Sequence, residues 1–303
     1  MKLWYASLYG LIFFWSLVSE AAEVTELRLT KPRDLQAPSY LYFTGLLEKA
    51  LRKAANGREV PQLVTTIEMA EDRMLRELRA GRRIDIFWFG GTEERARGLI
   101  MVPVPLERGL MGYRKFIIRK ERVAEFDAIK SLGDISQLKA CQGAQWSDTD
   151  IMHAASLRLV TSVNYESLFK QLDAGRCDYF SRGIHQGEKE LLQRAEAYPD
   201  LMVYEPLILH YPLGSHFFVH SKNKALAVWL QEGLEKMIDD GELIAYLKEH
   251  EYTSGAFPLV DDNVSQLLMV SNPYLPSSSD EKNPRYWFQP SDFASSASFH
   301  VRD

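Results

Sequence analysis

The sequence predicts a protein built from two α/β lobes. Apolar runs with strand spacing alternate with amphipathic helical patterns along residues 25–90, and the same alternation returns over residues 137–200. In both stretches Ala-Gly-Arg separates a helical pattern from a strand that carries an Asp, at 80–82 and again at 174–176. Gly81 and Gly175 are therefore expected to end their helices in the left-handed conformation. The repeat favours two lobes of related construction.

The elements follow one another in a regular order. In the first stretch, strand patterns cover 25–32, 61–68 and 83–90, and helical patterns cover 40–57 and 70–82. A separate extended segment covers 115–120. In the second stretch, strand patterns cover 137–145, 157–162 and 177–183, and helical patterns cover 147–156, 165–176 and 187–200.

Composition is that of an ordinary globular protein. The chain has 303 residues, of which 46% are hydrophobic and 25% charged, enough for one large domain or two smaller ones. The formal net charge is -5, and no block of Lys and Arg stands out. Because phosphate binding requires a basic surface, we expect no nucleic-acid partner.

The N-terminus indicates export. Lys2 precedes the apolar run Leu3 to Val18, and Ser19 and Ala21 stand where a signal peptidase reads small residues. A membrane anchor is the alternative, but sixteen residues are fewer than the roughly twenty that span a bilayer. Residues 1–22 are thus predicted to be a signal peptide, and the mature protein is expected to be periplasmic.

The chain has two cysteines, Cys141 and Cys177, each in or beside a predicted strand. They could form a disulfide in an oxidising compartment. The alternative is two separate buried thiols, which we favour slightly because a bridge between neighbouring parallel strands often strains its preferred geometry. No CxxC motif indicates a metal site, and we expect no cofactor.

Several ordered elements resemble the bacterial periplasmic solute-binding proteins of family 3, which bind polar amino acids for ABC importers. They include "LRELRAGRRIDIFW", "TEER", "KFIIRK", "LFKQLDAGRCDYF" and the segment from His216 to His250. The resemblance covers roughly residues 24 to 250 and implies the type II periplasmic-binding-protein fold. In that fold two α/β lobes are joined by two crossing strands, and a ligand cleft lies between the lobes.

The resemblance also implies boundaries. Residues 23–115 plus 216–270 would form lobe one, and residues 116–215 would form lobe two. Residues 271–303 would be a C-terminal tail, partly disordered after about Phe293 but with aromatic side chains able to pack onto a lobe.

In amino-acid-binding relatives, an Arg at the start of the first crossing strand grips the ligand carboxylate, so the resemblance places Arg114 or Lys115 there. Arg114 is favoured because its planar fork binds a carboxylate through two parallel hydrogen bonds. A solvated charge at the hinge is the alternative.

Other candidate ligand contacts lie near the same cleft. Gly143 and Ala144 form the predicted turn before a helix whose free N–H groups could hold an anionic group. Trp88, Trp146 and Tyr42 could line an aromatic pocket, although such residues are more often core, and Thr92 offers a hydroxyl.

Where relatives place an acidic residue for the ligand ammonium, this chain has Arg182. We therefore expect a small polar ligand that is anionic or resembles an amino acid. The predicted protein is a monomer that closes around its ligand at a hinge and delivers it to an ABC permease. A module that reports the ligand to a separate membrane sensor is the alternative.

An enzyme is not expected, since neither HExxH nor GxSxG occurs. A lyase on the same fold, with His185 beside a cleft carboxylate, is the less favoured reading.

Overall fold

The structure, a computed structural model, describes residues 25–32, 34–293 and 300–302. The predicted signal peptide, residues 1–22, lies outside the described residues. The strands of the described part are β1 (Glu26–Leu29), β2 (Gln62–Thr65), β3 (Ile86–Gly90), β4 (Leu99–Met101), β5 (Tyr113–Arg119), β6 (Lys139–Gly143), β7 (Arg158–Ser162), β8 (Tyr179–Gly183), β9 (Leu201–His210), β10 (Ser215–His220), β11 (Gln266–Met269) and β12 (His300–Arg302). Its α-helices are α1 (Pro38–Lys53), α2 (Glu71–Ala80), α3 (Glu93–Ala96), α4 (Val123–Asp127), α5 (Leu132–Ile135), α6 (Ser147–Ala154), α7 (Tyr165–Asp173), α8 (Gly187–Leu192), α9 (Lys224–Asp239) and α10 (Glu242–Glu249).

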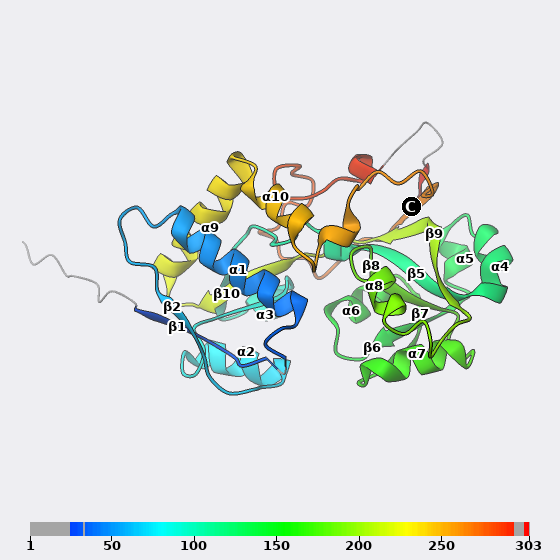
Figure 1. Ribbon diagram of the computed structural model, residues 1–303, viewed down its shortest axis with the longest axis horizontal. Coiled ribbons are helices and arrows are strands. Elements are labelled where there is room, and N and C mark those ends of the chain that lie inside the picture. Colours follow the sequence, from blue (N-terminus) through cyan, green and yellow to red (C-terminus); the bar gives the residue numbers. More distant parts are fainter. Residues whose placement is uncertain (1–24, 33, 294–299, 303) are drawn as a thin grey trace, which may run out of the picture.

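The elements group into two lobes (Figure 1). Lobe one holds the parallel pair β1-β2 and the antiparallel sheet β3-β10-β4, with α1, α9 and α10 on one side and α2 on the other. Its core is apolar because α1 turns Phe43, Leu46, Leu47 and Leu51 inward at helical spacing.

Lobe two is built on one mixed sheet of the described residues, in the order β12-β11-β9-β5-β8-β6-β7. Successive residues of β5 alternate between its faces, so Phe116 and Ile118 pack in one core while Ile117 packs with α7 in another. The two-lobed α/β construction predicted from the sequence is therefore present.

The predicted helix ends are confirmed. Gly81 follows α2 with φ 62°, and Gly175 lies two residues after α7 with φ 70°, both left-handed. The predicted helix over 187–200 is shorter than expected, since α8 ends at Leu192.

Two of the segments by which the chain passes between the lobes touch each other. Residues 102–112 lead from β4 into β5, and residues 211–214 lead from β9 into β10. The Tyr211 N–H donates to the Gly112 carbonyl at 3.1 Å. A Cβ added at Gly112 would lie 2.0 Å from the Tyr211 oxygen, so this crossing point requires glycine.

The predicted residue ranges of the lobes remain a prediction, and one boundary differs from the observed pairing. Gln266–Met269, expected in lobe one, is strand β11 and pairs in parallel with β9 of lobe two. The chain thus returns to lobe two after α10, which the sequence pattern did not indicate.

The expectation of two separate thiols is wrong, because Cys141 and Cys177 form a disulfide. Cys141 lies in β6, whereas Cys177 precedes β8 by two residues. The bridge therefore joins a strand to the turn that enters the neighbouring strand, with the two Cα atoms 5.5 Å apart, and does not link paired strand residues.

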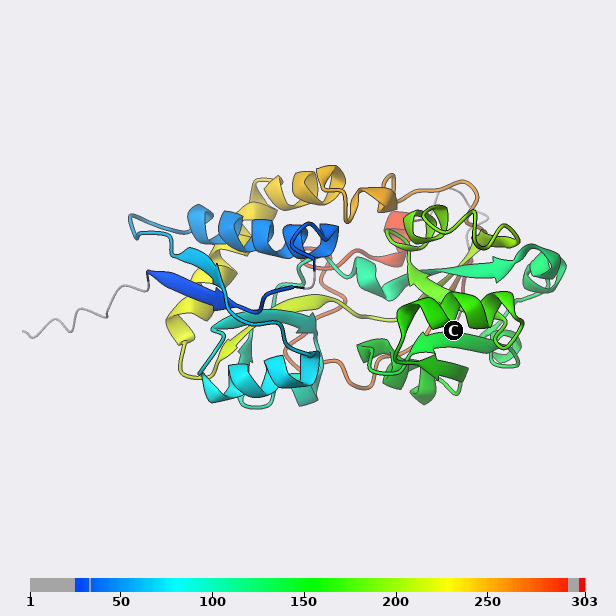
Figure 2. The same ribbon diagram turned by 60° about the horizontal axis from the view of Figure 1, so that its bottom comes forward.

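The tail from residue 271 crosses the molecule twice. It leaves β11, contacts lobe one where the Glu93 N–H donates to the Tyr274 carbonyl, and returns so that β12 pairs with β11. Figure 2 shows this segment in orange to red between the two lobes. Residues 294–299 and 303, where disorder was expected, lie outside the described residues, whereas His300–Arg302 form β12.

Aromatic side chains of the tail pack against the crossing segments. Trp287 is 3% exposed and lies against Gly109 and Gly214, where an added Cβ would meet its ring at 2.4 and 3.3 Å. The Phe288 N–H donates to the Arg108 carbonyl, and the Tyr113 hydroxyl donates to the Phe288 carbonyl, both at 2.9 Å. The tail is therefore part of the hinge core.

Trp287→Ala is expected to lower the free energy of unfolding by about 3–5 kcal/mol, because it removes a large buried ring from this core. Urea unfolding of the parent and the variant measures the difference. Tyr274→Ala, in the same tail but 42% exposed, is the matched control and should change stability far less. Equal losses in the two variants would contradict the packing described.

Candidate functional site

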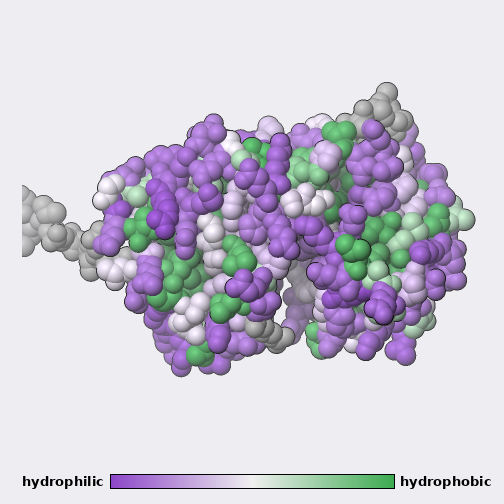
Figure 3. Space-filling model, in the orientation of Figure 1, coloured by the Kyte–Doolittle hydropathy of each residue, from purple (hydrophilic) through white to green (hydrophobic). Residues whose placement is uncertain are grey.

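A cleft of about 400 Å3 lies between the two lobes. Figure 3 shows the surface notched between the left and right halves of the molecule. Side chains from both lobes and from the crossing segments line the cleft: Ser39, Phe43, Glu71, Met74, Phe87, Trp88, Phe89, Gly90, Arg95, Met111, Arg114, Trp146, Ser147, Asp148, Arg182, Gln186, Leu213, Ser215 and Tyr252.

The lobes approach each other at one edge of this cleft. A Cβ added at Gly90, the last residue of β3 in lobe one, would lie 2.5 Å from the Ser147 hydroxyl at the start of α6 in lobe two. The absence of a side chain at Gly90 therefore permits the contact.

Arg114 lies at the base of the cleft and is 1% exposed. Its Nη2 donates to Asp148 Oδ2 at 2.6 Å, and its Nη1 donates to the Met111 carbonyl at 3.0 Å. The Tyr211 hydroxyl donates to the same Oδ2 at 2.8 Å, and Gln142 Nε2 donates to Oδ1 at 2.6 Å. The charge of Arg114 is thus neutralised by a carboxylate that is itself fully hydrogen-bonded.

Arg182 is neutralised in the same way. Its Nε and Nη2 donate to the two carboxylate oxygens of Glu190, both at 2.7 Å. Burial lowers the pKa of Arg182, but the Glu190 charge outweighs burial and leaves the pKa above the usual arginine value. The guanidinium also lies 4.7 Å from the centre of the Trp146 ring.

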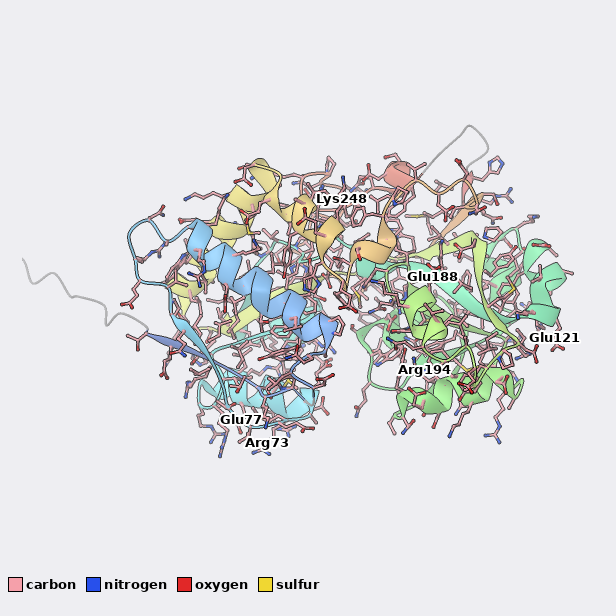
Figure 4. All side chains as sticks on the ribbon, in the orientation of Figure 1. Arg73, Glu77, Glu121, Glu188, Arg194 and Lys248 are labelled. Atoms are coloured by element: carbon pink, nitrogen blue, oxygen red, sulfur yellow. A yellow bond between two sulfur atoms is a disulfide. The ribbon has the colours of Figure 1, made fainter. Side chains whose placement is uncertain are left out.

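A second arginine extends this aromatic cluster. Arg194, labelled on lobe two in Figure 4, lies over Tyr165 and Phe169 and pairs with Glu166. From the sequence we expected the positive charges of Arg114 and Arg182 to favour an anionic ligand. Each of these arginines already has a carboxylate partner, so their charges do not support that expectation.

The cleft is also lined by an arginine that the site prediction missed. Arg95, in the short helix α3, pairs with Glu71 of α2 and donates from Nη1 to the Gly90 carbonyl at 3.2 Å. The Arg95 side chain is 15% exposed and that of Glu71 is 51% exposed. Unlike the two buried pairs, this ion pair has a carboxylate that can move into solvent.

Thr92 caps the helix that carries this arginine. Its hydroxyl accepts a hydrogen bond from the Arg95 N–H at 3.2 Å and so begins α3. Thr92 does not line the cleft, whereas Trp88, predicted as an aromatic wall, does.

The predicted turn before α6 is present. A Cβ at Gly143 would lie 2.3 Å from the Trp146 ring, so glycine allows Trp146 to fold back over the strand and line the cleft. The Gly143 carbonyl accepts from the Thr149 hydroxyl at 2.6 Å. Ala144 lines a neighbouring cavity, together with Glu71 and Ser162, and does not face the main cleft.

Two predicted contacts lie elsewhere. Lys115 follows Arg114 on β5 and therefore points to the opposite face of the sheet, where it pairs with Glu205 and Asp261. Tyr42 is fully buried in lobe one and donates its hydroxyl to the Leu106 carbonyl at 2.7 Å. Neither residue lines the cleft, so both are removed from the candidate site.

His185, weighed for a lyase, is 2% exposed and packs edge-on to Tyr252. Burial, and then the positive charges of Arg114 and Arg182, lower its pKa to about 3. The ring is therefore neutral at physiological pH. Among the described residues, no group of three or more His, Cys, Asp or Glu is placed to hold a metal ion.

A buried acid lies beneath the cleft at the hinge. Glu107 is 0% exposed, and its carboxylate accepts from the Ser215 hydroxyl at 2.5 Å and from the Ser215 N–H at 3.0 Å. Burial raises the pKa of Glu107 to about 7, while the bonds from Ser215 act in the opposite direction.

Comparison with solved structures identifies the architecture. An ancestral arginine-binding protein bound to arginine is similar over 75% of this chain and 99% of its own, with TM-score 0.53 and 18% identity. The type II periplasmic-binding-protein fold is therefore confirmed. The complex of an ancestral arginine-binding protein with glutamine has TM-score 0.51, 19% identity and coverage of 75% and 97%.

A third structure with this fold is an ancestral amino-acid-binding protein described as a precursor of cyclohexadienyl dehydratase. It has TM-score 0.52, 16% identity and coverage of 75% and 95%. No family model matches the sequence, and no curated protein matches it. In the described part of the chain, none of the helices is both long enough and apolar enough to cross a membrane.

The stability contributed by Glu107 should depend on pH. Because its folded pKa is raised to about 7, the folded protein binds this proton more tightly than the unfolded chain does. Its contribution is fully present below the ordinary carboxyl pKa of 4.5 and is lost as the pH rises through about 7.

In the parent, the free energy of unfolding should fall by about 3 kcal/mol from this group as the pH rises from 4 to 8. In Glu107→Gln this fall should be absent. Urea unfolding at several pH values measures both. Glu94→Gln, at an exposed position, is the control and should follow the parent. Curves for the parent and Glu107→Gln that run parallel across this range would show that Glu107 does not titrate as described.

Proposed function

We propose that this protein is an extracytoplasmic solute-binding protein that captures a small, amino-acid-like ligand and delivers it to an ABC importer. The proposal rests on the cleft between the lobes and on the Arg95–Glu71 ion pair that lines it. The carboxylate of this pair is exposed to solvent. Its arginine can exchange that partner for a ligand at small cost, because a solvent-exposed ion pair contributes little stability.

The same pair suits a zwitterion. A ligand carboxylate would take the two-pronged face of Arg95, and a ligand ammonium would lie against Glu71. Asp148 and Glu190 are not available for the ammonium, since each is held by a buried arginine. We therefore propose a ligand that carries both a positive and a negative charge, in place of an anionic one.

Closure would complete the site from lobe two. Ser147 and Asp148 begin α6 and line the cleft, and their backbone N–H groups have no partner within the helix. The helix N-terminus favours the carboxylate end of a ligand held on the opposite wall. Movement about the two crossing segments would bring these walls together, as in other two-lobed binding proteins.

The solved structures that are similar to this chain are amino-acid-binding proteins, which supports the proposal. The similarity is one of fold. Export rests on residues 1–22, which are tested by fractionating cells and sequencing the N-terminus of the mature protein. A separate membrane sensor as the receiving partner is the alternative, and uptake of labelled ligand in a strain lacking this protein distinguishes the two.

Arg95→Ala should weaken binding of an amino-acid ligand by about tenfold or more, because it removes a charge-assisted contact. A thermal-shift screen of the mature protein against the proteinogenic amino acids finds the ligand, and calorimetry then gives the dissociation constants. Arg97→Ala, an exposed position at the end of the same helix, is the matched control. Equal affinity in the two variants, or no shift with any amino acid, would overturn the proposal.

A further inference from the structure

The C-terminal tail connects lobe two directly to α3 of lobe one. At the lobe-two end, the Val270 N–H donates to the His210 carbonyl at 2.7 Å, directly after the parallel pairing of β11 with β9. At the lobe-one end, the Glu93 N–H donates to the Tyr274 carbonyl at 3.1 Å, and the Glu93 carboxylate accepts from the Ser277 N–H at 2.7 Å. Each end of this segment is therefore fixed on a different lobe.

The segment between the two fixed ends is short. Tyr274 follows Val270 by four residues, so the two cannot lie more than roughly 14 Å apart even in a fully extended chain. Along the way, the side-chain amide of Asn272 donates to the Pro212 carbonyl of the second crossing segment at 2.8 Å. While the bonds to Glu93 hold, the first turn of α3 must therefore stay close to lobe two.

The helix held in this way is the one that carries Arg95. α3 has four residues and is too short to be stable alone, so its position depends on contacts from outside. From α2, Arg79 donates to the Glu94 and Arg97 carbonyls at 2.8 and 3.0 Å. From the tail come the two bonds to Glu93. The tail thus helps to place the lobe-one wall of the cleft relative to lobe two.

Beyond this contact the tail stays bound to lobe one. The Tyr286 hydroxyl donates to the Glu235 carboxylate of α9 at 3.0 Å, and Arg285 pairs with Asp239 of the same helix. The stretch between Ser277 and Arg285 therefore begins and ends on lobe one, unlike the segment before it.

We propose that residues 270–277 are a strap that limits how far the two lobes separate at the cleft. As the lobes move apart, α3 can follow lobe one only until the strap is taut, and further opening has to break its bonds to Glu93. Arg95 then stays near the lobe-two wall, which reduces the movement needed to close the cleft around a ligand. The strap acts on the position of the lobes, so this inference goes beyond the proposed function and does not depend on the ligand.

Lengthening the strap tests the inference directly. A six-residue Gly-Ser insertion after Ser271 lengthens the segment that joins the lobes by up to roughly 20 Å. The same insertion after Ser278 is the matched control, because it lengthens only the stretch that begins and ends on lobe one. Both sites are exposed, and exposed loops tolerate insertions.

Spin labels on the two lobes report their separation. Arg73→Cys in α2 and Lys170→Cys in α7 place one label on each lobe at exposed positions (Figure 1). Cys141 and Cys177 are joined in a disulfide, so the label attaches to the introduced thiols. Pulsed electron resonance then gives the distribution of distances in the mature protein without ligand.

The insertion after Ser271 should broaden this distribution and move its mean outward by about 5 Å or more, because a longer strap permits wider opening. The insertion after Ser278 should give the distribution of the parent. Glu93→Ala, which leaves the chain length unchanged, removes one of the two bonds and should shift the mean in the same direction by less. The inference is overturned if the insertion after Ser271 leaves the distribution unchanged, or if both insertions broaden it equally. Since no ligand is used, that result leaves the proposed function standing.

Discussion

The buried ion pair between Arg114 and Asp148 holds together the parts that the site depends on. Arg114 is the second residue of β5, the first strand after the crossing, and Asp148 lies in the first turn of α6, which lines the cleft. Tyr211, from the second crossing segment, and Gln142, from β6, bind the same carboxylate. One carboxylate therefore ties both crossings, a central strand and the cleft helix into one unit.

Aromatic side chains pack around the same crossing segments. The Tyr113 ring is stacked between His210 at 3.9 Å and Phe293 at 4.0 Å, and Trp287 fills the space behind Gly109 and Gly214. The tail thus packs against the hinge from outside, and the ion pair lies within it. Closure would then occur as movement of whole lobes, while the wall formed by α6, β8 and Arg182 keeps its shape.

This arrangement separates two roles that arginine plays in the cleft. Arg114 and Arg182 maintain shape, because removing either would leave a carboxylate buried without its partner. Arg95 is the arginine whose partner is half-exposed and therefore replaceable. The Phe87–Trp88 stack lies in the wall that this cleft shares with a neighbouring cavity.

The two-lobed α/β fold could be predicted because the sequence signals for its helices and strands are local. The spacing of apolar residues and the glycines at 81 and 175 are properties of short segments. Tyr42 lay within the helix predicted over 40–57, and it was misplaced because helical spacing puts its ring on the buried face of α1 together with Leu46. Lys115 could have been excluded by strand alternation alone, once Arg114 was placed facing the cleft.

The sequence did not reveal contacts between residues that lie far apart along the chain. Asp148 lies 34 residues from its arginine, and the Trp287 packing depends on a return of the tail that no periodicity indicates. Glu190 lies only eight residues after Arg182. Predicting this ion pair would have required the geometry of the turn between β8 and α8. Arg95 carried one signal, the hydroxyl of Thr92 three residues before it, which is typical of a helix start beside the cleft.

The central claim is that the Arg114–Asp148 ion pair holds the crossing segments to α6. A double-mutant cycle of Arg114→Met and Asp148→Leu, followed by urea unfolding without ligand, tests it most directly. Each single variant should lose about 3–5 kcal/mol of unfolding free energy, because it leaves one charge buried alone, and the double variant should lose less than the sum. Strictly additive losses, or single variants as stable as the parent, would contradict the account.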